Sequence, residues 1–268
     1  MEKFFQRVYQ TIQKPEMRIL PGQLSFFLLL SIIPLVALIA TIISHFSISI
    51  ESLMELISKT LPSEIASILN QAIDGKSMNL NIAIFYISAF ILASNGPHSM
   101  IIGSNLIYKV DNKDYLDRRI KSIFMTVILV ILLVFMLIVP AYGDMIIKFV
   151  IKVIAVDSID QTLLITYNIL KYPISILLIF FCVKLLYTIA PDKSIKSNST
   201  TYGAIFTTIS WIISTEIYSF YVSDFAKYNL LYGSIANLLI LFLWVYLLSY
   251  IFVLGMALNA SQETESVE

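Results

Sequence analysis

The sequence has few of the residues with which soluble enzymes do chemistry. Its 268 residues include one cysteine, Cys182, two histidines, His45 and His98, and only 13% charged side chains. One cysteine excludes an internal disulfide framework and leaves the redox compartment undetermined. Neither histidine has a cluster of cysteines or carboxylates near it in the sequence, which argues against a metal centre of the usual ligand spacing. We therefore expect no metal and no other cofactor.

Long apolar runs are abundant instead. Hydrophobic residues make up 58% of the chain, and the mean hydropathy is +0.83. An uncharged run of about 20 residues crosses the roughly 30 Å hydrocarbon core as a helix, because only a helix satisfies its own backbone groups in lipid. The sequence therefore predicts an all-α membrane protein with six transmembrane helices, at about residues 23–46, 80–108, 121–143, 163–189, 200–223 and 231–260.

The distribution of basic residues predicts how these helices are oriented. The N-terminal segment and the second and fourth loops hold eleven lysines and arginines, whereas the other three loops hold five. By the positive-inside rule both termini are cytoplasmic, and residues 261–268 form a cytoplasmic acidic tail. The first apolar run is too long for the apolar core of a signal peptide, so we expect it to remain as an anchor.

Two segments outside the spans have amphipathic patterns. Residues 47–79 predict two short helices on the outer membrane surface, separated at Pro62. Residues 1–20 predict a cytoplasmic interfacial helix with Phe5, Tyr9 and Ile12 on one stripe. Packing of this N-terminal helix under the bundle is an equally good interpretation.

Several short motifs occur in a recognisable order. The first predicted span contains Ser31 and Pro34, and the second ends in a segment with Asn105 and Tyr108. A polar loop contains Pro191, and the last third of the chain adds Tyr232, Gly233, Ser234, Trp244, Tyr246, Leu254, Gly255 and Asn259. This series resembles the YihY/BrkB family of bacterial inner-membrane proteins over essentially the whole chain. The resemblance implies a multi-pass protein of the bacterial plasma membrane.

The resemblance says less about activity. Family members often carry an acidic residue where this chain has Ala257 and a basic residue where it has Leu106, so a mechanism that requires those charges is in doubt here. An older label in the family is ribonuclease BN, a tRNA-processing enzyme. The residues of this chain argue against that activity, because they offer no metal-ligand set and no folded aqueous domain to hold RNA. We expect neither an enzyme nor a nucleic-acid partner.

Ionisable residues within the predicted spans are the strongest functional candidates. Placing Lys or Glu near a helix centre costs about 2.5–3.5 kcal/mol on insertion scales. Lys171 and Lys184 lie in the fourth predicted span and Glu216 in the fifth. Counted from the turn between these antiparallel spans, Glu216 and Lys171 lie at similar depths, about 33 and 35 Å, and Lys184 at about 15 Å. The spacing favours a Lys171–Glu216 pair, and the alternative is that the lysines extend to the headgroups.

The second predicted span is the irregular one. Gly96 and Pro97 interrupt it, flanked by Asn95 and His98. Proline removes one backbone donor and frees a carbonyl, so a kinked or broken helix here is a candidate polar pathway. A kink repaired by neighbouring helices explains the pattern equally well, as it does the predicted helix break at Pro34.

Three functions from different classes fit these features. The first is transport of a lipid or other amphiphilic envelope component, with membrane lipids as partners. The second is a cation or proton antiporter that uses Glu216, and the third is a non-transporting scaffold for envelope assembly. A homo-oligomer or a complex with an envelope protein is compatible with each of them.

Overall fold

The structure is a bundle of α-helices. The computed structural model describes residues 2–45, 87–88, 90–131, 161–225 and 234–265. Within these ranges the chain forms helices joined by short loops and contains no β-strand, in agreement with the predicted all-α class. The predicted surface helices over 47–79 lie outside the described residues, as do Tyr232 and Gly233.

The N-terminal region forms a short helix followed by a long one. Helix α1 runs from Glu2–Ile12, and α2 from Glu16–His45. The boundary falls at Pro15, where the missing N–H is not needed, and Glu16 then places a negative charge in the first turn of α2. Beyond that point α2 remains helical through Pro34.

Helix α1 contacts the bundle with one face. It packs against α11, with Val8 against the core and Thr11 only 2% exposed. Tyr9 and Ile12 of the predicted apolar stripe are exposed instead, Tyr9 by 65%. Helix α1 therefore contacts the bundle on the side of Val8 and Thr11. Its exposed side, with Tyr9 and Ile12, is left for a membrane surface.

The middle of the chain forms α6, from Asn95–Tyr108, and a helix over residues 115–131. Helical structure before α6 is interrupted at Ser94, so Gly96 and Pro97 lie in the first turn of α6. At the other end Lys109 adopts a left-handed conformation with φ of 53°, and the Val110 N–H donates to the Asn105 carbonyl at 2.9 Å. This C-terminal motif turns the chain away from α6.

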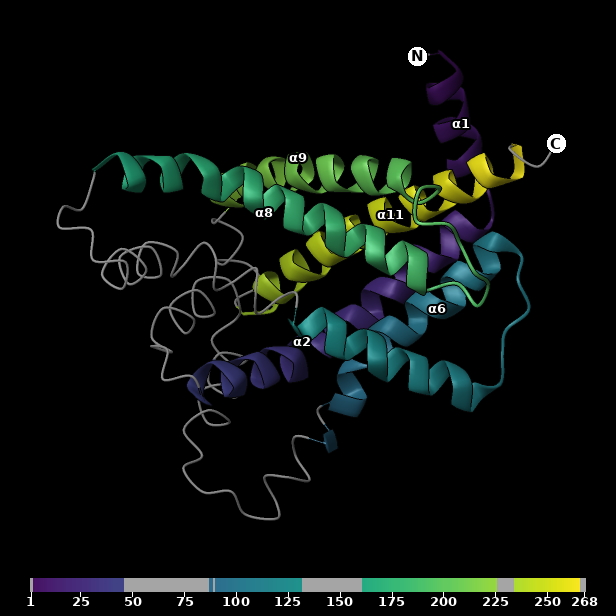
Figure 1. Cartoon of the computed structure of the whole chain (residues 1–268), viewed down its shortest axis with the longest axis horizontal. Helices are drawn as coiled ribbons and strands as arrows, with labels where there is room; N and C mark the ends of the chain where they lie inside the picture. The colour runs from purple at the N-terminus through teal and green to yellow at the C-terminus, as the bar shows by residue number, and fades with distance from the viewer. Residues whose placement is uncertain (1, 46–86, 89, 132–160, 226–233, 266–268) are drawn as a thin grey trace.

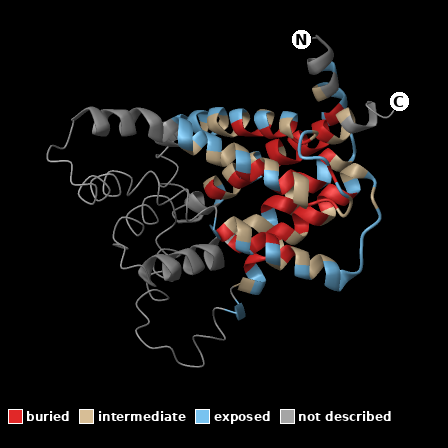
Figure 2. Ribbon diagram, viewed as in Figure 1, coloured by how far each residue is buried: buried red, intermediate tan, exposed pale blue. Residues whose placement is uncertain are grey.

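The C-terminal half contains three long helices, each of which packs against a neighbour along the chain. Helices α8, Gln161–Ile189, and α9, Thr201–Phe225, pack against each other, and α11, Ser234–Glu265, packs against α9. Helix α11 also contacts α2 and α6, so it lies at the centre of the arrangement (Figure 1). Buried residues, red in Figure 2, gather in the middle of the bundle. The largest fully buried side chains include Tyr187, Phe252 and Ile101.

The bundle exposes apolar side chains and packs several small polar ones between its helices. Apolar side chains at four-residue spacing on α9 are exposed: Ile205, Ile209, Ile213 and Ile217, by 46%, 53%, 53% and 64%. Hydroxyl and amide side chains lie inside, including Ser25, Ser104, Asn105, Ser122, Thr126, Thr207 and Asn259, each at most 1% exposed. Small and polar residues between helices with apolar residues outside are typical of helix packing in lipid.

Judged by length and composition alone, one described segment is long and apolar enough to cross a membrane. This is Leu239–Gln262 in α11, whose most apolar stretch is half buried in the bundle; Pro173–Ile189 in α8 is apolar but shorter. Both chain termini lie at one end of the bundle, together with the loops 109–114 and 190–200 (Figure 1). We call this the terminal end.

Candidate functional site

A cavity of about 590 Å³ lies between six helices on the side of the bundle away from the terminal end. Ligand sites in proteins usually measure about 300–1,000 Å³ and are mostly apolar with a few polar groups. The lining comes from α2, α6, the 115–131 helix, α8, α9 and α11: Leu28, Ser31, Met100, Leu129, Ile179, Cys182, Val183, Leu186, Trp211, Ile212, Thr215, Glu216, Trp244, Val245, Leu248, Ser249 and Phe252.

Exposure distinguishes the mouth of this cavity from its floor. Thr215 and Glu216 line the cavity and are also exposed at the surface, so they mark its opening. Val183, Ser249 and Phe252 line it as well but are each 1% exposed, so they form its floor. The Ser249 hydroxyl has no hydrogen-bond partner among the described residues. The opening is therefore marked by a carboxylate and the interior is apolar, with one unpaired hydroxyl.

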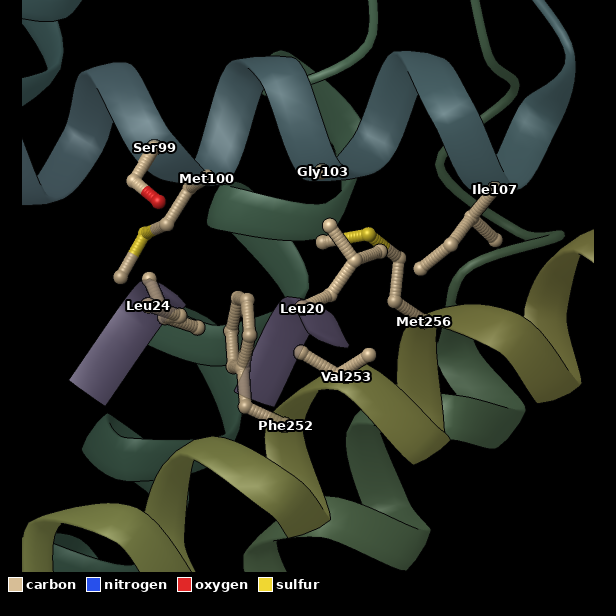
Figure 3. A pocket seen from close by; sticks show the side chains of 9 residues that line it. All are labelled: Leu20, Leu24, Ser99, Met100, Gly103, Ile107, Phe252, Val253 and Met256. Carbon is tan, nitrogen blue, oxygen red and sulfur yellow. The ribbon is translucent and has the colours of Figure 1, made fainter. Parts of the chain in front are cut away.

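Toward the terminal end the cavity stops at a tightly packed layer. Met100 and Phe252 line the cavity on one side and a gap of only about 10 Å³ on the other. Figure 3 shows the side chains of α2, α6 and α11 converging on that gap, which has room for at most about one water molecule. The cavity is closed at this end.

The close approach of α9 and α11 contributes to this closure. Gly203 and Gly255 face each other where the helices cross, and the Gly203 N–H donates to the Asn259 side-chain oxygen at 2.6 Å. A methyl group built on Gly203 would lie 2.2 Å from the Gly255 carbonyl oxygen, and one on Gly255 would lie 2.1 Å from the Thr207 hydroxyl. The two backbones can meet only because both residues lack a side chain.

A buried hydroxyl chain lies next to this crossing. The Tyr187 hydroxyl donates to the Phe252 carbonyl at 2.7 Å and lies 2.7 Å from the Thr207 hydroxyl. Because a phenol carries one proton, Thr207 must donate to Tyr187. Tyr187 thereby links α8, α9 and α11 at a depth where unpaired backbone carbonyls would be costly.

A second polar cluster ties the loops of the terminal end together, and we call it the loop cluster: Asn105, Asn112, Lys121 and Asp192. The Asp192 side chain is 1% exposed and forms an ion pair with Lys121 at 2.7 Å. Asn105 donates to the other Asp192 oxygen at 2.6 Å and accepts the Asp192 N–H at 2.8 Å. Lys121 also donates to the carbonyls of Ala190 and Pro191, each at 2.8 Å.

The surroundings of Asp192 set its protonation. Burial acts to raise the pKa of this carboxyl, but the hydrogen bonds from Lys121 and Asn105 and the charge of Lys121 outweigh it. The pKa of Asp192 therefore lies below its ordinary value, and the group is ionised at neutral pH. The loop cluster joins α6, the 115–131 helix and the loop between α8 and α9 through one ionised carboxylate.

The predicted ionisable residues lie in different environments. Glu216 is at the mouth of the cavity and forms no ion pair with another described side chain. Lys184 lies with its ammonium 5.8 Å from the centre of the Phe180 ring, and it does not line the cavity. The structure does not describe the side chain of Lys171, so its pairing with Glu216 stays a prediction.

The residues around Gly96 contact neighbouring helices. Arg119 donates to the Asn95 side-chain oxygen and to the Ile91 carbonyl, both at 2.9 Å. The Gly96 N–H donates to the Ser31 hydroxyl at 3.3 Å. The His98 ring lies 5.8 Å from the Tyr115 ring, and its Nδ1 is buried without a described partner. Arg119 and Ser31 thus supply polar contacts where Pro97 disturbs the helix, and a bend of its axis stays a prediction.

The family motifs fall at two places in the structure. Asn105 and Pro191 belong to the terminal end, where the Pro191 carbonyl accepts from Lys121, and Tyr108 lies there under the Lys193 ammonium at 4.9 Å. Gly255 and Asn259 form the helix crossing, while Ser31 and Trp244 line the cavity. Several residues of the cavity, the helix crossing and the loop cluster are not predicted as functional from the sequence: Lys121, Tyr187, Asp192, Gly203, Thr207, Trp211 and Ser249.

Acidic and sulfur ligands do not gather in the described part of the chain. No group of three or more His, Cys, Asp or Glu side chains occurs among those residues. Cys182 lines the cavity alone, surrounded by apolar side chains.

An apolar exterior, hydroxyl and amide side chains packed between the helices and a ligand-sized cavity are typical of an α-helical membrane protein. Its sequence matches the family model described as virulence factor BrkB over residues 8–268. The chain therefore belongs to the BrkB family.

Curated relatives cover most of the chain. A Bacillus subtilis protein named as ribonuclease-like, YfkH, is 29% identical over 89% of this chain and 87% of its own length. A UPF0761 membrane protein of Vibrio campbellii is 26% identical over 96% of this chain and 81% of its own length. Another from Vibrio parahaemolyticus is 25% identical over the same shares. No solved structure matches the chain. The relatives' names agree with a membrane protein of the BrkB and UPF0761 group.

Proposed function

We propose that this protein moves a lipid or another amphiphilic envelope component across the bacterial inner membrane. The cavity carries the proposal, because it is large enough for a ligand, closed toward the terminal end and open beside Glu216. A pathway that is open at one end and sealed at the other is what alternating access requires. In this proposal the chain has six spans with both termini in the cytoplasm, so the cavity opens toward the outer leaflet.

The chemistry of the mouth supports an amphiphilic cargo rather than an ion. Ile213 and Ile217 on α9 are exposed on either side of Thr215 and Glu216, and Leu243 on α11 is 57% exposed. An apolar chain can therefore pass from the bilayer into the cavity along the apolar side chains that flank Thr215 and Glu216. The loss of water contact by such a chain is favourable by about 25 cal/mol for each Å² buried.

The test is lipid translocation in proteoliposomes with a fluorescent lipid whose outer-leaflet population is chemically quenched. We expect purified protein to move lipid faster than empty vesicles, and Glu216→Gln to reduce that excess rate strongly. Asp117→Asn is the matched control, since it makes the same carboxylate-to-amide change in an exposed residue away from the cavity. Equal rates in protein-containing and empty vesicles, with protein shown to be folded, would rule out lipid transport.

A proton or cation antiporter is the second candidate, and the position of Glu216 favours it. A carboxylate at a cavity mouth without a described ion-pair partner can exchange a proton for a cation. The same vesicles loaded with a pH-sensitive dye separate the two functions. Cation-driven pH changes that Glu216→Gln abolishes, without lipid movement, would replace the lipid proposal by the antiporter.

A further inference from the structure

The shape and charge of the cavity also narrow the class of amphiphile. We propose that it binds an amphiphile with a single apolar chain and a cationic, amine-type head group, with the head at Glu216 and the chain directed to Phe252. This inference rests on the proposed function, since it names the cargo of the same site. Neither the family nor the names of the relatives assign a ligand to it.

The volume of the cavity suits one chain. A space of about 590 Å³ holds roughly 20 groups the size of a water molecule, at about 30 Å³ each. That is the size of one long alkyl or acyl chain, whereas the two chains of a phospholipid need about twice as much. The walls suit a chain, because nearly all lining side chains other than Ser31, Thr215, Glu216 and Ser249 are apolar.

Charge selects the head group. Among the described residues that line the cavity, Glu216 is the only ionisable acid or base apart from the thiol Cys182. An ammonium group at the mouth gains a charge-assisted hydrogen bond to this carboxylate, whereas a carboxylate or phosphate there is repelled. Trp244 lines the same cavity and offers an aromatic face that also attracts cations.

The depth of the cavity fits a ligand whose apolar chain lies inside while its head group stays at the mouth. Two hydrogen bonds join α9 and α11 at different levels, from Trp211 to the Leu248 carbonyl at 2.9 Å and from Tyr218 to the Ile240 carbonyl. By this register Glu216 lies level with residue 243 of α11, so Phe252 is about 13 Å deeper at 1.5 Å per residue. A bound chain can run from the carboxylate at the surface to the aromatic floor.

Residues of the protein itself can report whether the cavity is occupied. Both of its tryptophans, Trp211 and Trp244, line the cavity, and so does its one cysteine, Cys182. Contact with a brominated chain quenches tryptophan fluorescence, and an occupied cavity shields Cys182 from a small maleimide. Binding can therefore be measured on the full chain in phosphatidylcholine nanodiscs without transport.

The experiment compares three probes with the same chain, brominated at its far end: hexadecylamine, hexadecanol and hexadecanoic acid. We expect the amine to quench at about tenfold or more lower concentration than the alcohol, with the acid weakest, and to protect Cys182. Glu216→Gln should bring the amine to the level of the alcohol, while Asp117→Asn should retain the preference. The Cys182→Ser variant identifies the labelled residue.

The outcomes separate this inference from the proposed function. Equal binding of the three probes, or a preference that survives in Glu216→Gln, would overturn the cationic head group while leaving lipid transport intact. Binding of the amine without translocation in vesicles would support the inference and remove the transport function. If no probe quenches the tryptophans or protects Cys182, the cavity is not a binding site and both proposals fail.

Discussion

Single residues decide how closely the helices approach at the terminal end. Gly203 and Gly255 leave no space for even one methyl group, whereas Gly22 on α2 has no atom within 4 Å of the position of an added methyl. The three glycines therefore lie in very different environments. Only the first two allow the Asn259 side chain to reach the Gly203 N–H.

We expect Gly203→Ala and Gly255→Ala each to lower the free energy of unfolding by about 1–3 kcal/mol, because the added methyl must push apart atoms closer than 3 Å. The temperature at which detergent-solubilised protein loses its monodisperse peak on size exclusion measures this loss. Gly22→Ala is the matched control and should be neutral or slightly stabilising. Equal stability of all three variants would contradict the close crossing.

At the residue scale the sequence predicts some of the candidate site and misses the rest for a physical reason. Glu216 was selected because a charge in an apolar run is costly, and Gly255 and Asn259 because they belong to a motif. Ser249 and Trp211 carry no such signal. Whether they line a cavity depends on the rotation of each helix about its axis, which packing decides.

At the scale of elements, the loop cluster connects three segments that are distant in sequence. Asn105 and Asp192 are 87 positions apart, and Lys121 and Asp192 are 71 apart. Helices this far apart in the chain are held together by one nearly buried ion pair and its hydrogen bonds. Removing one partner of such a pair costs more than the pair contributes, since the other charge remains buried.

We expect Lys121→Met to destabilise the protein by about 3 kcal/mol, near the lower limit for a buried pair, because the Lys121 side chain is 22% exposed. Asp192→Asn should cost less, as the lysine left behind can turn toward water. The double variant Lys121→Met/Asp192→Asn should recover part of the loss. Additive losses in this cycle, measured by thermal unfolding in detergent, would show that the two residues act independently.

The same pair predicts how stability depends on pH. Since the pKa of Asp192 is depressed in the folded protein, its contribution is fully present above its ordinary value of 3.8 and is lost as pH falls through the lower, folded value. We expect the stability difference between the natural protein and Asp192→Asn to be constant from pH 7 to about 5 and to shrink below about 4. A difference that already shrinks near pH 6 would mean that another group controls the pair.

Helix bounds were more predictable than helix contacts. The structure ends α6 at Tyr108 and α8 at Ile189, the residues at which the corresponding spans were predicted to end. The 115–131 helix and α2 both begin at the terminal end several residues earlier than predicted, at 115 and Glu16. Hydropathy marks where a helix enters the lipid, but these helices extend beyond that point through polar residues such as Asp117 and Arg18.

At the scale of the whole molecule, the terminal end gathers the loops that the positive-inside rule assigns to the cytoplasm. The structure brings the termini and the loops 109–114 and 190–200 to the same end of the bundle (Figure 1). The side of the membrane on which this end lies stays a prediction. It determines which leaflet the cavity mouth faces.

We expect cysteines introduced at Asp114 and Asn198, both exposed, to react only with reagents that reach the cytoplasm. In the Cys182→Ser background, a membrane-impermeant maleimide added to intact cells should label neither position. A permeant maleimide should label both. Labelling of either position by the impermeant reagent would reverse the topology and turn the cavity mouth toward the cytoplasm.

A tilt of α9 about its crossing with α11 would change the width of the cavity mouth. The two helices meet through bare backbone at Gly203 and Gly255, and Trp211 and Tyr218 join them further along by hydrogen bonds to α11 carbonyls. In Figure 1 the two helices diverge away from the terminal end. Glu216 lies 13 residues along α9 from Gly203, about 20 Å, so a tilt of about 10° would displace it by about 3.5 Å. Such a tilt would change the width of the mouth by nearly the thickness of a hydrocarbon chain.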